Sequence, residues 1–247
     1  MSDLLVGDAR PKTATLRGLI GASKIRRRKC LRLWCGMNIH SAPTKTEANA
    51  VPPSRHSQQR LVATDKRDAI MAAALALFVE RGFYGTAVPE IAERAAVGAG
   101  TIYRYFESKE ALVNELYRRE KQRFVAHVML DFPGGPAREL FRSMWMKMAK
   151  FAGENVESFV FLELHHHARY LDTESRKLEQ RMLDTFSMIT VSAQQRGELR
   201  AGPPRLLMGI VLGAFIGVIR CCLENEQDVT TADWKLAEQC AWEAIRA

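Results

Sequence analysis

Alternating strand patterns and internal repeats are both missing from this 247-residue sequence. Apolar residues recur instead at helical spacing from about residue 64 to the C-terminal end. The content of 47% hydrophobic and 26% charged residues is ordinary for a soluble globular protein. The sequence therefore predicts an all-α protein, with enough chain for one large domain or two smaller ones.

Cysteine is scarce, and its spacing is that of neither a disulfide framework nor a zinc site. The chain has five cysteines, an odd number, with no CxxC pair. Cys30 and Cys35 lie in the N-terminal segment, and Cys221, Cys222 and Cys240 lie in apolar, helical surroundings. We interpret them as reduced thiols and expect a cytoplasmic protein.

Long hydrophobic runs are also missing. The longest apolar run, Leu206–Ile219, has 14 residues and is followed by Arg220. A membrane-spanning helix needs about 20 apolar residues. No secretory signal pattern opens the chain. We therefore expect this run to form a buried helix and expect no membrane partner.

The positive charge is concentrated at the N-terminus. Residues 1–36 carry nine Lys/Arg and two acidic residues, which is a net +7 of the chain's +8. The remainder is nearly neutral, so the overall charge is poor evidence for DNA binding. Three explanations stay open: non-specific phosphate contacts, a transit-peptide-like segment, or an over-long reading frame whose natural start is Met37.

Two short helices and a tight turn follow the first long helix. Thr64 can cap the first helix and Gly82 can end it in the left-handed conformation. Residues 89–96 form a second helix, a turn follows at Val97 and Gly98, and a third helix runs through Phe106. A fourth helix, 108–128, begins at a serine cap. This arrangement is typical of a helix-turn-helix.

The third helix has one apolar face and one face suited to DNA. Ile102 and Phe106 are four residues apart and share a face, with Val97 beneath them. Arg104 and Gly100 point farthest from that face, where an arginine can reach guanine edges. Small residues at the helix start let the backbone approach DNA closely. We expect DNA contacts from Thr86, Gly98, Ala99, Gly100, Thr101, Tyr103, Arg104, Tyr105 and Lys109.

The segment Asp65–Leu116 resembles the DNA-binding domain of the tetracycline-repressor (TetR) family. The resemblance rests on FVERGFYGTAV and on PEIAERAAVGAGTIYRYFESKEAL, in which GTIYRYF-x-SKEAL is highly specific to the family. It implies a homodimeric, ligand-responsive transcription factor, usually a repressor. Five residues fall where family members touch DNA: Thr101, Tyr103, Arg104, Tyr105 and Lys109.

Two residues depart from the family pattern. Ala87 stands where a Ser or Thr commonly caps the second helix, which costs about 1 kcal/mol unless Thr86 substitutes for that cap. Ala96 stands where the turn commonly has Gly, and it is strained there if the position needs a positive φ.

The C-terminal half is predicted to be wholly helical, over about 137–152, 155–171, 173–196, 204–223 and 231–246. Consecutive histidines in FLELHHHARYLD span too wide an arc to bind one metal together. Glu163 with one of them can bind a metal, line a ligand cavity or simply pack at a helix edge, and the neighbouring methionine-rich helix can be ordinary core or an adaptable pocket. The candidate pocket residues are Met144, Trp145, Met148, Phe159, Glu163, His166 and His167.

Three glycines, Gly209, Gly213 and Gly217, lie on one face of the predicted helix 204–223. Glycine lowers helix stability, so three on one face indicate close approach of another helix. That helix can belong to the same chain. The interpretation that follows the resemblance is a dimer formed by the last two helices, with Ala241 also at the interface.

The predicted organisation is a basic, mostly disordered leader (1–60), a helix-turn-helix DNA-binding domain (63–123, motif at about 87–106) and a helical ligand-binding and dimerisation domain (124–247). No catalytic triad, phosphate loop or paired carboxylates are present, so we expect no enzyme, no cofactor and an unknown small-molecule effector. Two alternatives remain: a metal-binding protein or enzyme that uses Glu163 and His165–His167, or a dimeric scaffold with a degenerate helix-turn-helix.

Overall fold

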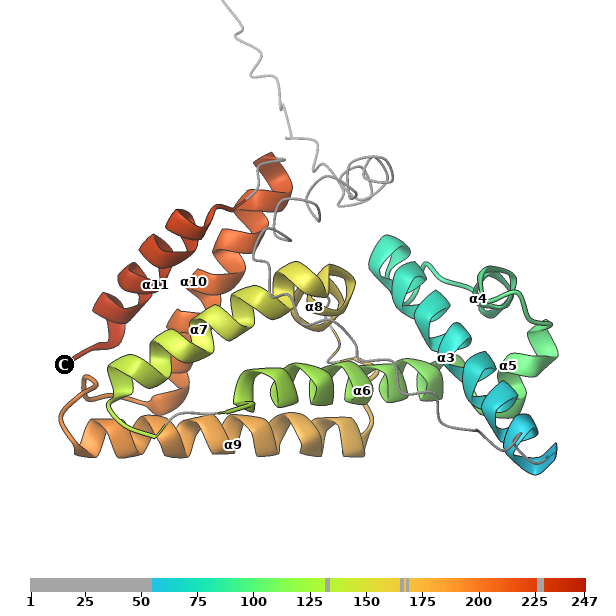
Figure 1. The fold of residues 1–247 in the computed structure, drawn as a ribbon, viewed down its shortest axis with the longest axis horizontal. Helices are drawn as coiled ribbons and strands as arrows, with labels where there is room; N and C mark the ends of the chain where they lie inside the picture. Colours follow the sequence, from blue (N-terminus) through green and yellow to red (C-terminus); the bar gives the residue numbers. More distant parts are fainter. Residues whose placement is uncertain (1–54, 132–133, 165–166, 168, 226–228) are drawn as a thin grey trace, which may run out of the picture.

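The computed structural model describes residues 55–131, 134–164, 167, 169–225 and 229–247 (Figure 1). Within these ranges every regular element is a helix, and the β-type pairing is confined to one isolated bridge between Leu199 and Arg246. The all-α prediction is confirmed. The helices are α3 (Arg55–Arg81), α4 (Val88–Arg94), α5 (Ala99–Tyr105), α6 (Lys109–Met129), α7 (Ala137–Glu154), α8 (Val156–Leu164), α9 (Thr173–Gln195), α10 (Pro204–Asn225) and α11 (Thr231–Ile245).

Helix α3 begins earlier than the sequence pattern indicates. It starts at Arg55 rather than near Thr64, so residues 55–60 of the expected leader belong to a helix. The expectations for residues 1–54, including the alternative start at Met37, lie outside the described residues. At the other end, Gly82 has a φ of +72°, which confirms the predicted left-handed stop.

The buried face of α3 joins the two halves of the protein. Ile70, Ala74, Leu77 and Phe78 are all at most 2% exposed, as the spacing predicts. The Phe78 ring stacks on Phe161 of α8 at 6.3 Å between centroids. Because this contact is buried and aromatic, the N-terminal helices are packed directly onto the larger domain.

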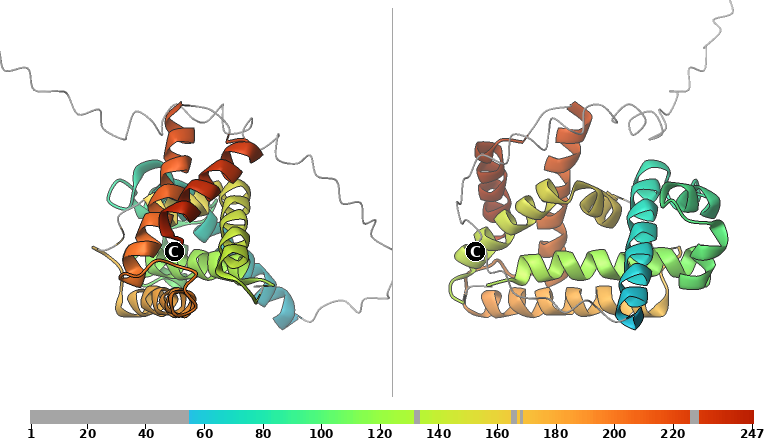
Figure 2. Two further views of the ribbon diagram at one scale, coloured as in Figure 1. Left: turned by 90° about the vertical axis from the view of Figure 1, so that its left-hand side faces the viewer. Right: turned by 45° about the vertical axis from the view of Figure 1, so that its right-hand side comes forward.

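Helix α6 connects the two ends of the molecule. Its first turn, capped by Ser108 Oγ accepting from the Ala111 amide at 3.0 Å, lies beside α3. It then runs alongside α9 into the larger domain, where α7 crosses above it (Figure 1). Helices α10 and α11 form the end of the molecule opposite to α4 and α5 (Figure 2).

The predicted helix 155–171 is too long. Helix α8 ends at Leu164, and the chain turns at His167, whose carbonyl accepts hydrogen bonds from the Tyr170 and Leu171 amides. The His167 ring bonds to the Phe161 carbonyl, so a side chain satisfies an acceptor that helix continuation would otherwise use. The other C-terminal helices end within two residues of their predicted bounds.

The expectation that the apolar run 206–219 forms a buried helix is wrong. Within α10 only Leu207 and Phe215 are fully buried, at 4% and 0%, whereas Leu206 is 58% and Ile210 is 40% exposed. Of the helices described, α10 alone is long and apolar enough to cross a membrane, a test that soluble core helices also pass. An apolar face that the chain leaves uncovered indicates an interaction surface.

Candidate functional sites: a DNA-contacting surface and an apolar cavity

Helices α4 and α5 are held at a fixed angle by the turn between them. Helix α4 ends in a Schellman motif, in which the Ala96 amide donates to the Glu93 carbonyl at 3.1 Å and the Val97 amide donates to the Ala92 carbonyl at 3.0 Å. This motif requires a left-handed residue, and Ala96 has a φ of +53°. The strain expected from an alanine at this position is therefore present.

Helix α5 presents the face that the sequence predicts. Ile102 and Phe106 are 1% and 3% exposed and form its inner face, with Val97 packed against the same core. Tyr103 is 57% exposed, and Arg104 is exposed on the opposite side. Within the described ranges, the Arg104 side chain has no hydrogen bond or ion pair to another residue, so its guanidinium is available to a ligand.

The other α5 residues in the expected DNA set divide into two groups. Gly98, Ala99 and Gly100 are exposed at the start of the helix, and a Cβ at Gly100 would meet open space. Thr101 and Tyr105 are half-buried on the flanks, where Tyr105 packs against the core. Contact of these residues with DNA stays a prediction.

Thr86 has a structural role instead of the expected DNA contact. Its side chain is buried at 2% exposure, and its hydroxyl donates to the Gly82 carbonyl at 2.8 Å and lies 3.2 Å from the Leu77 carbonyl. It therefore does not cap α4 either. Of the two hydrogen bonds of a capping box, Glu90 makes one, because its carboxylate accepts from the Ala87 amide at 2.9 Å. The amide hydrogen bond and Arg81 hold the pKa of Glu90 below its ordinary value, although burial opposes them.

The Lys109 side chain also forms hydrogen bonds within the chain. Its ammonium donates to the Phe83 and Thr86 carbonyls, each at 3.0 Å, and lies 4.3 Å from the centre of the Phe83 ring. Lys109 thus joins the start of α6 to the loop between α3 and α4. Two of the three N–H groups are therefore used within the chain, and the expected contact of Lys109 with a phosphate stays a prediction.

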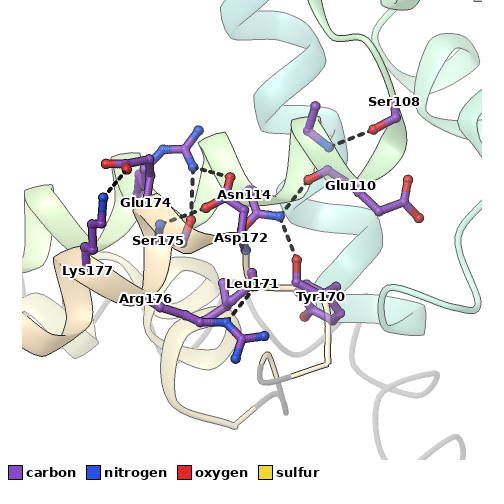
Figure 3. A network of polar contacts seen from close by, with 12 residues as sticks. Ser108, Glu110, Asn114, Tyr170, Leu171, Asp172, Glu174, Ser175, Arg176 and Lys177 are labelled. Atoms are coloured by element: carbon purple, nitrogen blue, oxygen red, sulfur yellow. Dashed lines mark hydrogen bonds and ion pairs between the residues drawn. The ribbon is translucent and has the colours of Figure 1, made fainter.

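The loop before α9 is fastened to α6 by one buried amide (Figure 3). Asn114, 2% exposed, donates to the Tyr170 and Glu110 carbonyls at 2.7 and 2.9 Å and accepts from the Asp172 amide at 2.8 Å. Asp172 caps α9 by accepting from the Ser175 amide at 2.7 Å and pairs with Arg118 at 2.8 Å. This network holds the end of α6 nearest to the DNA-contacting helices against the larger domain.

A chain of ring contacts runs across the same junction. The Tyr170 ring stacks on Phe83 at 4.4 Å between centroids, and the Lys109 ammonium lies 4.3 Å from the centre of the same Phe83 ring. Burial raises the pKa of Tyr170 to about 12, and its hydroxyl lies 2.6 Å from His167 Nδ1. Because the Phe161 carbonyl can only accept, His167 Nε2 carries the proton and Nδ1 accepts from Tyr170. His167 therefore supports this junction.

The larger domain has an apolar cavity of about 420 Å³, partly open to solvent, between α6, α7, α9, α10 and α11. Met144 and Met148 line it, as expected, together with Glu163 of α8. The main additional lining residues are Lys121, Phe124, Val128, Leu140, Phe141, Met182, Leu183, Phe186, Ile189, Thr190, Arg205, Met208, Val211, Leu212 and Trp242. A cavity of this size and polarity suits a small apolar ligand.

Three residues of the expected pocket lie elsewhere. Trp145 is 1% exposed and donates from Nε1 to the Trp234 carbonyl at 3.1 Å. Phe159 is core, with its ring 5.6 Å from Phe215. His167 belongs to the junction described above, and His166 lies outside the described residues. Periodicity alone does not separate core from cavity walls, because both need apolar side chains.

One ion pair lies in the wall of the cavity. Lys121 Nζ and Glu163 Oε1 are 3.0 Å apart, and their side chains are 6% and 11% exposed. The rings of Tyr117 and Phe124 flank the ammonium at 6.0 and 5.9 Å. Sequence analysis singled out Glu163 but missed Lys121, whose partner is on another helix.

The metal alternative gains no geometric support from the residues that the structure describes. Among them, no group of three His, Cys, Asp or Glu side chains is placed to hold an ion. Glu163 is paired with Lys121, and His167 is bonded to Tyr170 and Phe161. His165 and His166 lie outside those residues.

The glycine face of α10 is open. Gly209, Gly213 and Gly217 are exposed, and a Cβ at any of them would meet no atom within 4 Å. The alternative of close packing inside the chain is therefore wrong. Ala241, however, is 4% exposed within the chain, so its expected place at a dimer interface is corrected.

The fold is that of a helix-turn-helix unit joined to a helical domain with a ligand cavity, which is the architecture of ligand-responsive DNA-binding regulators. A family model for bacterial regulatory proteins of the tetR family matches residues 70–116, and one for the tetracyclin repressor-like C-terminal domain matches residues 117–247. Because the second match covers more than half of the chain, the protein belongs to the TetR family.

Individual relatives agree with this assignment. The HTH-type transcriptional repressor KstR2 of Mycobacterium tuberculosis is 32% identical over 118 residues, which are 47% of this chain and 54% of KstR2. This chain thus spans about half the length of that curated relative. A tetR family transcription regulator structure from Shewanella sp. PV-4 is 25% identical, with a TM-score of 0.65, over 74% of this chain and 98% of that one.

A further solved structure shares the fold. It is the transcriptional regulator FadR from Bacillus subtilis in complex with stearoyl-CoA, which is 22% identical, with a TM-score of 0.57, over 71% of this chain and 95% of that one. At this identity the likeness concerns the fold alone.

Proposed function

We propose that the protein is a homodimeric, sequence-specific DNA-binding repressor that an apolar small molecule releases from its operator. It acts in the cytoplasm by binding rather than by catalysis and needs no cofactor. Family membership supports DNA binding, and the exposed face of α5 offers the groups that a major groove reads: Arg104, Tyr103 and Thr101. The apolar lining of the cavity supports a ligand with a long apolar part.

The observation that carries the proposal is that α6 belongs to both sites. Lys109, at its start, holds the loop beside the DNA-contacting helices, and Lys121, Phe124 and Val128 line the cavity. At a rise of 1.5 Å per residue, Lys109 and Lys121 are about 18 Å apart along one rigid helix. A ligand that shifts α6 at the cavity therefore also moves the loop that Lys109 holds.

The DNA-binding part is tested with the Arg104→Ala variant and DNA from upstream of the protein's own gene. We expect the wild type to retard this DNA, and the variant to lose about 1–3 kcal/mol of specific binding and to relax preference at one base position. The matched control is Arg181→Ala, which removes the same charge from an exposed position on α9. An unchanged binding-site selection profile for Arg104→Ala contradicts the proposed orientation of α5.

The dimer is tested at Gly213. The exposed stripe on α10 and α11 includes Leu206, Ile210, Gly213 and Leu236, so a second copy can cover it. Gly213→Leu should yield a folded monomer, since the new side chain meets open space within its own chain. Specific DNA binding should fall with it, because a monomer cannot place two recognition helices one DNA turn apart.

Sedimentation of Gly213→Leu, with Gly134→Leu as a control at another open glycine, decides this part. A Gly213→Leu dimer with wild-type operator affinity means that the interface lies elsewhere.

A further inference from the structure

The cavity wall is apolar except at a few places, and the Lys121–Glu163 pair is the most enclosed of them. Arg205 also lines the cavity, but it pairs with Asp184 at 3.4 Å, and both side chains are more than half exposed. Thr190 turns its hydroxyl to the Phe186 carbonyl of its own helix. Lys121 and Glu163 are therefore the charged groups that a ligand meets in the buried part of the cavity.

The two members of the pair differ in what they can still offer. A lysine ammonium has three N–H donors, and Glu163 is the one hydrogen-bond acceptor that the described residues give Lys121. A ligand oxygen can therefore accept from Lys121 while the ion pair remains intact. A ligand ammonium, by contrast, has only donors, so it finds no acceptor on Lys121 and would have to compete with Lys121 for Glu163.

We infer that Lys121 recognises an oxygen acceptor, either a carboxylate or a carbonyl, at one end of an otherwise apolar effector. This inference rests on the proposed effector cavity and adds the chemical class of the ligand and the group that selects it. At about 30 Å³ per non-hydrogen atom, as in liquid water, a cavity of about 420 Å³ holds a ligand of about 14 such atoms. A medium-chain fatty acid or its ester has this size and this polarity.

The test uses the full chain and three probes of matched size: dodecanoic acid, methyl undecanoate and dodecylamine. Each displaces trans-stilbene, a neutral apolar fluorophore of the same size, below its own micelle concentration. We expect the acid and the ester to bind about tenfold more tightly than the amine, the size of one hydrogen bond to a charged group.

Variants locate the selecting group. Lys121→Met with Glu163→Leu removes both charges together, which avoids leaving one charge buried without its partner and so keeps the protein folded. This double variant should still bind the fluorophore, but the preference for acid and ester over amine should disappear. The matched control, Lys177→Met with Glu174→Leu, removes an exposed pair on α9 and should keep the full preference.

The outcomes separate this inference from the proposed function. Equal binding of all three probes, or tighter binding of the amine, overturns the role of Lys121 while leaving an apolar effector in place. The inference is also overturned if Arg205→Met, and not the double variant, loses the preference for acid and ester over amine. The ligand oxygen would then lie beside Arg205, at the exposed end of the cavity. If neither the fluorophore nor any probe binds, the effector cavity of the proposed function fails as well.

Discussion

Replacing Ala96 by glycine should make the protein more stable, although most substitutions to glycine do the opposite. Ala96 is exposed and has a φ of +53°, and the hydrogen bonds of the turn need this conformation. A residue with a Cβ pays roughly 1–2 kcal/mol for the left-handed region. Glycine removes this cost but loses about 0.5–1 kcal/mol to the greater freedom of the unfolded chain. The net expectation is a gain of about 0.5–1 kcal/mol.

The measurement is urea denaturation of the full chain, followed by circular dichroism at one protein concentration, because a dimer's stability depends on concentration. In a separate thermal denaturation, the midpoint temperature should rise by about 2 °C for a chain of this size. Ala72→Gly is the control: Ala72 is exposed in the interior of α3, where the same substitution should destabilise by about 1 kcal/mol.

The two variants make the same chemical change, so their effects on the unfolded chain largely cancel. The difference between them, about 1.5–2 kcal/mol, therefore measures the cost of the left-handed alanine. If Ala96→Gly lowers stability as much as Ala72→Gly does, alanine costs nothing at this turn and the strain argument is refuted.

Further predictions concern the junction in Figure 3. Asn114→Ala should destabilise the protein by about 2–3 kcal/mol, because the Tyr170 carbonyl and the Asp172 amide lose a buried partner; urea denaturation measures this loss, and a change under 0.5 kcal/mol contradicts it. Burial opposes ionisation of Asp172, but the Ser175 amide and Arg118 outweigh it and hold its pKa below the ordinary value of 3.8. The carboxylate therefore stabilises the protein above pH 3.8, and this contribution is lost as the pH falls through the lower, folded-state value. The stability of Asp172→Asn should consequently lie below that of the wild type at neutral pH and converge with it in acid; a constant gap across the titration contradicts this assignment.

Local patterns in the sequence were sufficient for the helices and for the recognition face. Ile102 and Phe106 share a side of α5 because of helical periodicity alone, and Gly82 ends α3 because glycine tolerates a positive φ. The strain at Ala96 was predictable for the same reason, since a helix ending of this type requires a left-handed residue. The specific run GTIYRYF-x-SKEAL carried the family assignment.

Tertiary contacts decided what the polar side chains do. Thr86 and Lys109 are polar residue types that are usually found at the surface. In the fold, however, their side chains donate to backbone carbonyls at the end of α3 and in the loop that follows it. Lys121 meets Glu163 across two helices. No local pattern encodes such pairings, because hydrogen-bond partners far apart in sequence are fixed only when the helices pack.

The same holds for which apolar faces are covered. Sequence composition makes α10 one of the most hydrophobic segments, and composition alone suggested a buried helix. The fold leaves Leu206 and Ile210 exposed while it buries Ala241 on the neighbouring helix. Periodicity determines that a helix has an apolar face, but the packing of all the helices determines whether that face meets the core, a cavity or another molecule.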